Sequence, residues 1–528
     1  MATEQLSFDV VIVGGGAAGL GAAIRLRQLA ISSGQDLSVC LLEKGATIGA
    51  HILSGAILDP RALNSLIPDW KKRKPPITQL VAEEKFLFLT KKNSFHLSPG
   101  HFNNSGCYVV SLGEVNQWMA QEAEELGVEI YPGFTAAKLI TDEKGSVAGV
   151  VTGEMGVDRA GNKKANYQPG IEIKARQTIF AEGCRGHLSQ ELISRFKLDH
   201  NRQPQSYSLG IKELWEVDSK AFKTGSTTHT VGWPLKSNCY GGGFIYHQTK
   251  SRVAIGLVIG LNYQNQNIDP FFEMQKFKTH KINKELLQGG RRIAYGARTI
   301  NTGGVQSLPK LSFPGGLLVG DGAGMLDVGR MKGIHTAIYS GQLAGEAIFS
   351  ALGAENSTVP LEVTSYEANL RASWIGKDLF KSRNIRPAFK WGLWPGLLYS
   401  WVDKSLLRGC APWNLHHSRM SYRIDQHTVE RAEHPDYPQA DGSLTFDKHS
   451  SLQHSALSPI ENQPNHLQTE FIDNRSNQLR KYCPAGVFSP VMTQTNCIHC
   501  KTCDIKDFDK NLRWRPPEAG SGANYVAM

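Results

Sequence analysis

The chain has 528 residues, including 53 glycines and nine cysteines, and a formal net charge of +10. This length allows two or three domains with substantial cores. The moderate positive charge suits an acidic protein or an anionic lipid surface. Because no basic run is interleaved with aromatic residues as a nucleic-acid groove requires, we expect no nucleic-acid partner.

The cysteines and the apolar runs limit the class of protein further. An odd number of cysteines disfavours a secreted disulfide framework, and we expect the five scattered ones to be small buried residues in a reducing compartment. These five are Cys40, Cys107, Cys184, Cys239 and Cys410. The longest nearly apolar run, 10–24, is too short and too glycine-rich to cross a bilayer. The first predicted strand starts at Phe8, so we expect no signal or transit peptide before it.

The first predicted element is a dinucleotide-binding unit. Residues 8–13 are typical of a buried parallel strand, 14–19 match G-x-G-x-x-G, and 20–29 continue as an amphipathic helix. The glycines allow a tight turn, a close pyrophosphate and close helix packing. A second strand, 37–42, leads to an acid that can accept hydrogen bonds from ribose hydroxyls, and this order of elements favours a binding site over an empty turn. The cofactor-binding candidates are Gly14, Gly16, Gly19, Glu43 and Lys44.

Two later stretches favour FAD over NAD. Residues 178–183 form a predicted strand that ends in Glu-Gly, and 317–324 form another, with a helix predicted over 333–345. This arrangement resembles the flavoproteins of the aromatic-hydroxylase and glutathione-reductase type. In them the late Asp contacts the FAD ribityl and pyrophosphate region, and the helix dipole stabilises negative charge on the reduced flavin. Those roles fall here to Asp321, Gly322 and Gly333, although Gly-Asp-Gly alone is equally typical of a plain turn.

The residues between these stretches predict a second layer. Residues 80–107 and 203–296 contain short alternating and aromatic segments, which indicate an antiparallel sheet that caps the flavin. Gly241, Gly242 and Gly243 lie together in an apolar strand. Their missing side chains let a flat ring or another backbone approach, or mark only a bulge, and the sequence leaves both interpretations open. After residue 353 the composition is polar and proline-rich, and 437–477 indicates long loops.

Two segments are candidates for contact with a membrane. Residues 52–70 are moderately apolar, end in Trp70 and are followed by four basic residues, which fits shallow insertion beside anionic headgroups. Residues 391–401 contain three Trp and one Tyr, typical of an interfacial belt. The alternative for each is an ordinary core helix.

A cysteine-rich stretch near the end of the chain predicts a metal site. Cys483 precedes a proline, and Cys497, Cys500 and Cys503 follow in Cys-x2-Cys-x2-Cys spacing. This spacing is typical of iron–sulfur clusters with four thiolate ligands. A structural zinc site usually takes two separate Cys-x2-Cys pairs and is the less favoured alternative.

Beyond these motifs, the chain resembles the electron transfer flavoprotein–ubiquinone oxidoreductase family nearly end to end. The segments that carry the resemblance are 48–56 (IGAHILSGA), 229–235 (HTVGWPL), 292–298 (RIAYGAR), 313–318 (FPGGLL) and 497–507 (CIHCKTCDIKD). The resemblance implies an oxidoreductase with one FAD and one 4Fe–4S cluster, which oxidises reduced electron transfer flavoprotein and reduces ubiquinone drawn from the bilayer. It places Gly241 and Gly242 at the quinone ring and assigns the cluster to Cys483, Cys497, Cys500 and Cys503.

The resemblance also implies an architecture and a location. The fold is expected to be α/β, α+β overall, with a Rossmann-like FAD-binding domain over 1–80, 108–202 and 297–352. An antiparallel quinone-binding cap would take 81–107 and 203–296, and a C-terminal region over 353–528 would hold a ferredoxin-like 4Fe–4S domain from about 440 onward. The protein is expected to be monotopic, on the bacterial cytoplasmic or mitochondrial inner membrane, through 48–70 and a second segment, 391–402.

Two positions depart from the family pattern. Family members often have Gly-Cys-x-x-Gly where this chain has Gly320 to Gly324, and often have Tyr where this chain has Phe488. A hydroxyl at the second position donates to a cluster sulfur and raises the reduction potential, so we predict a lower potential here, with Thr502 still able to donate.

Three rival functions stay open at this point. A flavin monooxygenase or prenyl reductase shares the FAD fold but needs no cysteine loop. An electron donor of the nitrogen-fixation type typically uses a separate ferredoxin. A zinc-bearing binding module would hold no flavin. Oligomeric state and quinone tail are not encoded in any motif.

Overall fold

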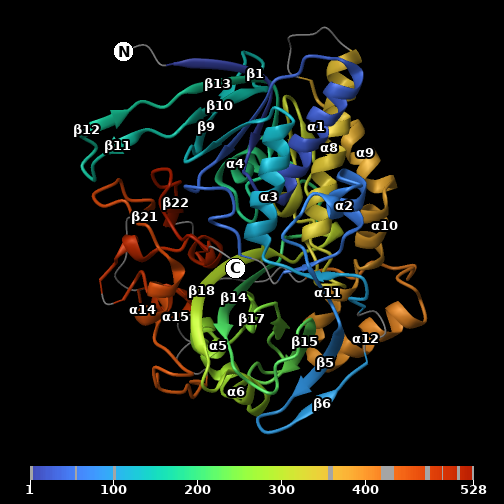
Figure 1. The fold of residues 1–528 in the computed structure, drawn as a ribbon, viewed down its shortest axis with the longest axis vertical. Coiled ribbons are helices and arrows are strands. Elements are labelled where there is room, and N and C mark those ends of the chain that lie inside the picture. Colours follow the sequence, from blue (N-terminus) through green and yellow to red (C-terminus); the bar gives the residue numbers. More distant parts are fainter. Residues whose placement is uncertain are drawn as a thin grey trace.

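The computed structural model describes residues 4–53, 56–98, 103–354, 361–417, 433–469, 476–489, 491–507, 512–525 and 528. These residues form two large sheets with their helices and a C-terminal region of short elements (Figure 1). The first sheet is at the top of Figure 1, the second is at the bottom, and the C-terminal region from α14 onward is at the left.

The first sheet contains the predicted dinucleotide-binding strands, in the order β19-β20-β13-β1-β2-β8. Its centre is fully buried, because residues 10–12 and 40–41 are apolar on both faces. The parallel strands are β1 (Gln5–Val13), β2 (Val39–Glu43), β8 (Glu129–Pro132), β13 (Glu172–Phe180) and β20 (Gly316–Leu318). The antiparallel strands are β9 (Ala136–Thr141), β10 (Val147–Thr152) and β19 (Ser312–Phe313). The strand predicted over 317–324 is only partly correct, because Gly320–Ala323 is a helical turn, α7.

Helices α1 (Ala17–Ser33) and α8 (Ile334–Ala354), both predicted, pack against each other through glycines. A Cβ on Gly21 would lie 2.6 Å from the carbonyl oxygen of Ile338, and one on Gly341 would lie 1.9 Å from that of Ala18. Glycine therefore permits a backbone approach that brings the start of α8 beside the start of α1. The other helices of this half are α2 (Arg61–Leu66), α3 (Leu112–Glu125) and α4 (His187–Arg195).

The second sheet confirms the predicted cap, in the order β18-β14-β17-β16-β15-β5-β6. Its strands are β5 (Glu83–Leu89), β6 (Ser94–His96), β14 (Tyr207–Glu216), β15 (Ser226–Gly232), β16 (Gly241–His247), β17 (Arg252–Gly260) and β18 (Arg291–Asn301). All pairs are antiparallel except β5 with β15, which come from distant segments and are not joined by a hairpin. Helices α5 (Pro270–Lys278) and α6 (Lys281–Leu287) follow β17.

The polar region after residue 353 contains helices that the sequence pattern did not predict. Tyr366, Leu370, Ile375 and Leu379 are buried in the core of the first sheet, so tertiary packing rather than a strong local period stabilises the first two of these helices. The helices are α9 (Ser365–Ala372), α10 (Trp374–Lys381), α11 (Ile385–Ala388) and α12 (Leu393–Ser405).

The C-terminal region is mostly loops, as predicted, with short elements around the cysteines. They are α14 (Lys448–Leu452), β21 (Leu467–Thr469), α15 (Ser476–Tyr482), α16 (Thr502–Lys506) and β22 (Leu512–Trp514). The small sheets elsewhere are β3 (Ile57–Leu58), β4 (Gln79–Leu80) and β7 (Tyr108–Val109), and β11 (Met155–Val157) with β12 (Lys163–Gln168). The 3-10 turns are Trp70–Lys72, Val305–Ser307, Phe389–Trp391, Gln453–Ser455 and Gln494–Asn496.

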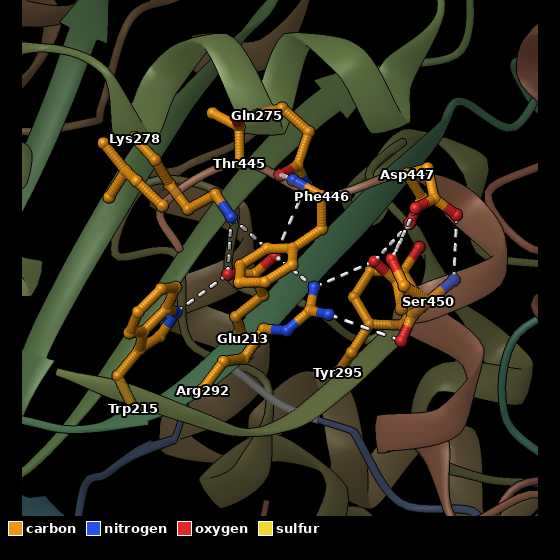
Figure 2. A network of polar contacts seen from close by, with 12 residues as sticks. Glu213, Trp215, Gln275, Lys278, Arg292, Tyr295, Thr445, Phe446, Asp447 and Ser450 are labelled. Atoms are coloured by element: carbon orange, nitrogen blue, oxygen red, sulfur yellow. Dashed lines mark hydrogen bonds and ion pairs between the residues drawn. The ribbon is translucent and has the colours of Figure 1, made fainter. Parts of the chain in front are cut away.

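A buried ionic network joins the second sheet to the C-terminal region (Figure 2). Glu213 of β14 accepts hydrogen bonds from Lys278 of α5 at 2.9 Å and from Arg292 of β18 at 3.3 Å. Arg292 in turn donates to the Ser451 hydroxyl of α14 at 2.8 Å, and its guanidinium stacks on Phe446. The network therefore fixes α14, and the chain that follows it, against the sheet.

Four of the five scattered cysteines are buried, as predicted, but Cys410 is exposed. None of the helices in the described part of the chain has the length and apolarity needed to cross a bilayer.

Candidate functional site

The glycines of the first turn have different physical roles. A Cβ on Gly14 would lie 2.5 Å from the carbonyl oxygen of Ala181, and one on Gly19 would lie 2.1 Å from that of Gly14, so both glycines allow close backbone packing. A Cβ on Gly16 would meet only the Ile52 side chain, at 3.8 Å, and would point into open space. The fold itself therefore does not require glycine at position 16, whereas a phosphate against this backbone would.

Glu43 lies at the end of β2, where backbone N–H groups of the neighbouring turns hold its carboxylate. Its carboxylate accepts from the backbone N–H of Gly15 at 2.9 Å and of Gly45 at 2.7 Å. The same carboxylate and Lys44 line a cavity of about 160 Å³ together with Gly14 and Gly16. An acid fixed here is well placed to accept from ribose hydroxyls, as the sequence predicts.

Asp321 lies on the other side of the turn, at α7. Its carboxylate accepts from the Asn301 backbone N–H at 3.3 Å, and burial raises its pKa to about 7. Gly333 immediately precedes α8, and the carbonyl oxygen of Gly333 accepts from the Ala337 N–H. The first N–H groups of α8, with the helix dipole, favour an anion at this end of the helix. Gly322 has no atom closer than 3.6 Å to an added Cβ.

A larger cavity, of about 400 Å³, brings residues of both sheets together. It is lined by Gly16, Asp321 and Gly333 from the nucleotide half and by Gly241 and Gly242 from the second sheet. Gly322 does not line it. The cavity therefore joins the predicted flavin residues to the predicted quinone residues.

The two glycines of β16 have a structural reason apart from any ligand. A Cβ on Gly241 would lie 2.3 Å from the carbonyl oxygen of Val258, and one on Gly242 would lie 2.3 Å from that of Thr230. Neighbouring strands thus explain the glycines, while the cavity wall that they form also leaves room for a ring.

Three polar residues of this cavity escaped sequence reasoning. Lys212 is 2 % exposed, and burial lowers its pKa to about 7. His229 Nε2 and the Tyr246 hydroxyl are 2.8 Å apart. The sequence did contain a signal for them: a lysine inside the apolar strand 207–216 and a histidine inside the apolar strand 226–232. Because successive side chains of a strand point to opposite faces, alternation could have placed both on the cavity face.

The four predicted cluster cysteines are all buried and lie in one core. Their exposed fractions are 6 % for Cys483, 9 % for Cys497, 7 % for Cys500 and 9 % for Cys503. Burial raises the pKa of each thiol, and burial together with the neighbouring Cys500 raises the pKa of Cys483 to about 11. Buried thiols of one cluster of residues are ionised together only when a cation compensates them, which a cluster's irons do.

Polar groups also surround the cysteine loop. The Thr502 hydroxyl lies 3.3 Å from Cys500 Sγ, and the His499 backbone N–H donates to Cys497 Sγ at 3.4 Å. Phe488 is 3 % exposed in the same core. These contacts supply donors of the kind that stabilise negative charge on a cluster sulfur.

One cysteine has a second set of neighbours. Cys497 Sγ and ring nitrogens of His466 and His499 all lie within 4.8 Å of one another. This trio suits zinc chemically. It shares Cys497 with the four-cysteine set, however, so one site excludes the other.

The two membrane candidates differ in exposure. The predicted wedge over 52–70 is wrong for its C-terminal part: Trp70 is 1 % exposed and donates to the Asn64 side chain, and apolar residues between 57 and 67 are buried. These residues pack in the core with α8, which the local sequence did not reveal. Ser54 and Gly55 of this segment lie outside the described residues.

Helix α12 instead exposes an apolar face. Trp394, Leu398 and Trp401 are 53, 65 and 46 % exposed and share one side at helical spacing. Leu397 and Ser400 of the same helix line the 400 Å³ cavity. The helix that carries the exposed α12 face, defined as Trp394, Leu398 and Trp401, therefore also forms part of the cavity wall.

Comparisons with known proteins agree with these features. Residues 207–300 match the family model described as ETF-QO, ubiquinone-binding. Residues 442–526 match the one described as electron transfer flavoprotein–ubiquinone oxidoreductase, 4Fe–4S, and residues 12–66 match an NAD(P)-binding Rossmann-like domain.

Solved structures show the likeness of the fold alone. A geranylgeranyl bacteriochlorophyll reductase-like protein from Thermoplasma acidophilum has a TM-score of 0.55 and 19 % identity, covering 81 % of this chain and 96 % of that one. The flavin-dependent brominase Bmp2 has a TM-score of 0.51 and 17 % identity, covering 76 % and 91 %.

Named relatives are much more similar in sequence. The mitochondrial electron transfer flavoprotein–ubiquinone oxidoreductase of Homo sapiens is 45 % identical, covering 98 % of this chain and 89 % of the relative. The Pseudomonas aeruginosa enzyme of that name is 44 % identical over the full length of both chains, and a probable one from Acinetobacter baylyi is 43 % identical over 99 % of both. Similarity at this level over nearly its whole length means that the chain belongs to the electron transfer flavoprotein–ubiquinone oxidoreductase family.

Proposed function

We propose that this chain accepts electrons from reduced electron transfer flavoprotein and passes them, through a 4Fe–4S cluster and FAD, to ubiquinone. One observation carries the proposal: a single cavity is lined by the nucleotide turn, by the start of α8 and by the glycine strand β16. Family membership supports the two cofactors and the oxidoreductase activity. The cofactors supply the electron chemistry, since FAD holds one or two electrons and a cluster one.

The residues assigned to FAD act by position and charge. Gly14 and Gly19 keep the turn tight, Gly16 leaves room for the pyrophosphate, and Glu43 accepts from ribose. Lys44 adds a cation near the phosphates. Asp321, Gly322 and Gly333 would face the ribityl chain and the flavin, where the N-terminus of α8 favours negative charge. Cys483, Cys497, Cys500 and Cys503 would hold the cluster.

The quinone enters from the side on which α12 lies. The α12 face would rest in the interfacial layer of a bilayer, which suits exposed Trp side chains. The same helix also lines, through Leu397 and Ser400, the cavity that reaches Gly241 and Gly242. This arrangement supports a protein bound to one surface of a bacterial cytoplasmic or mitochondrial inner membrane.

The domain division follows from the same assignment. We assign FAD to 1–80, 108–202 and 297–352, ubiquinone to a cap of 81–107 and 203–296, and the cluster to the end of 353–528. The two sheets and the family matches over 207–300 and 442–526 support this division.

The test is quinone reduction by the purified enzyme with reduced electron transfer flavoprotein as donor. Cys500→Ser should abolish this activity while FAD stays bound, whereas Cys410→Ser, at an exposed cysteine, should leave it unchanged. Full activity in Cys500→Ser would refute the ligand assignment. Flavin with no cluster signal in electron paramagnetic resonance would favour a monooxygenase or reductase, and zinc without flavin would favour a binding module.

A further inference from the structure

The cavity at the nucleotide end is lined by residues from two distant parts of the chain. Gly14, Gly16 and Lys44 form one wall, and Lys501 and Trp514 of the C-terminal region form another. The cluster-binding loop therefore reaches the pocket proposed for the adenosine half of FAD.

Lys501 is a buried lysine that has no ion-pair partner among the described residues. It is 5 % exposed, and its Nζ lies 2.9 Å from the centroid of the Trp514 ring. Among the described residues, its side chain forms no hydrogen bond or ion pair. The Nε1 of Trp514 is also buried without a hydrogen-bond partner. A buried ammonium is stable only beside compensating charge, so these two unused donors indicate a missing anionic or polar ligand.

The charges around the pocket point to the same ligand. Glu182 already accepts from Ser189, and Arg185 is paired with Asp504 at 2.8 Å. Three cations, Lys44, Arg298 and Lys501, then face two carboxylates, those of Glu43 and Glu182. This excess of positive charge suits a diphosphate.

We propose that Lys501 of the cluster-binding loop binds the adenosine diphosphate half of FAD, with the indole N–H of Trp514 as a second donor. The inference rests on the nucleotide site proposed above and adds to it a wall from the cluster region. Lys501 lies between two cluster cysteines with a φ of 67°, and the Thr299 side chain holds the Cys500 carbonyl oxygen at 2.8 Å. The loop conformation that binds the cluster is therefore the one that presents Lys501.

The experiment measures FAD release from the purified holoenzyme by equilibrium dialysis, with the fluorescence of free FAD as readout. Lys501→Met keeps the side-chain length and removes the charge, and should raise the dissociation constant roughly 10- to 100-fold. Arg513→Met removes an exposed cation from the same strand, β22, and should leave FAD release unchanged. Lys501→Arg should retain FAD within about threefold of wild type, because the cation is kept.

The outcomes distinguish failure of this inference from failure of the proposed FAD site. Unchanged FAD release in Lys501→Met, or equal weakening in Arg513→Met, overturns the inference. If Glu43→Gln weakens FAD binding and Lys501→Met does not, the nucleotide site stands and only the role of the loop fails. If neither change has an effect, the proposed nucleotide site fails.

A second variant covers the case in which Lys501→Met does not assemble the cluster, which electron paramagnetic resonance of the reduced protein reveals. Trp514→Phe keeps an aromatic ring under Lys501 and removes the indole donor. It should raise the FAD dissociation constant roughly 2- to 10-fold with the cluster signal intact. Wild-type FAD release in Trp514→Phe, or weakened FAD binding in Lys501→Arg with its cluster intact, then overturns the inference.

Discussion

Replacing Glu213 by Gln tests whether the buried network of Figure 2 holds the cluster region on the second sheet. Burial raises the pKa of Glu213, but Lys278 and Arg292 outweigh it and hold that pKa below its ordinary value. The stabilisation is therefore complete above about pH 4.5 and is lost as the pH falls through the lowered pKa. At pH 7, Glu213→Gln removes the only carboxylate within ion-pair distance of either cation in the described chain.

The expected cost follows from burial. Glu213 and Lys278 are fully buried, and loss of one partner from such a pair costs about 3–5 kcal/mol. The unfolding midpoint of the affected domain should then fall by roughly 6–20 °C, given roughly 2–4 °C per kcal/mol. The control is Glu285→Gln, whose carboxylate is exposed and 3.9 Å from Lys281, and which should cost about 0–1 kcal/mol.

The assay heats wild type and variants at one scan rate and follows cluster absorbance and FAD fluorescence in parallel. Cluster loss should shift to lower temperature more than FAD loss, because Arg292 and Tyr295 contact Ser451 and the Pro484 carbonyl oxygen beside Cys483. A double change, Glu213→Met with Lys278→Met, should recover part of the loss. A midpoint within 2 °C of wild type in Glu213→Gln would refute this reasoning.

Three further changes test the proposed sites. Gly16→Ala should weaken FAD binding by roughly tenfold or more without a folding cost, since its Cβ would meet only the Ile52 side chain, at 3.8 Å. Gly353→Ala should leave FAD binding unchanged, and equal FAD release in the two variants would contradict the assignment. The double change Trp394→Ser with Trp401→Ser should lower binding to anionic vesicles in a flotation assay by roughly tenfold or more. The control, Ile31→Ser on α1, should leave vesicle binding unchanged, and an equal effect of both would disprove the α12 face as the contact. Phe488→Tyr should raise the cluster midpoint in a redox titration by on the order of 20–60 mV, and an unchanged or lower midpoint would reject the proposed hydroxyl donor.

Local sequence predicted those parts of the fold whose reason is local. The turn from Gly14 to Gly19 and the strands beside it follow from steric rules that hold within a few residues, so their order could be read directly. Helices α9 and α10 were missed because burial in the core of the first sheet, not a strong local period, stabilises them. Trp70 was misassigned for the same reason: an apolar residue before basic ones is exposed or buried according to what packs on it.

The site shows the same limit. Single motifs predicted candidate residues for each cofactor, but not that Lys501 and Trp514 line the same cavity as Gly14, Gly16 and Glu43, since that placement depends on contacts across several hundred residues. At Gly241 and Gly242, in contrast, the local sequence pattern did bear on the structure. The pattern left a close approach and a bulge open, and the structure shows a close approach by backbone carbonyls of the neighbouring strands.

Because the cluster region belongs to the same chain as the flavin-binding fold, the distance between the two cofactor sites is fixed, which a flavoprotein with a separate ferredoxin does not achieve. A separate carrier would dock through an exposed, mostly polar surface and would find the flavin in varying orientations. Here Thr299 holds the loop carbonyl of Cys500, Arg185 pairs with Asp504, and the Gly520 N–H donates to the Lys44 carbonyl oxygen. These contacts come from the loop on both sides of the cysteines and from the chain end. They fix the four thiols relative to the nucleotide turn, so the separation of the two cofactor sites is a property of the fold and does not depend on an encounter.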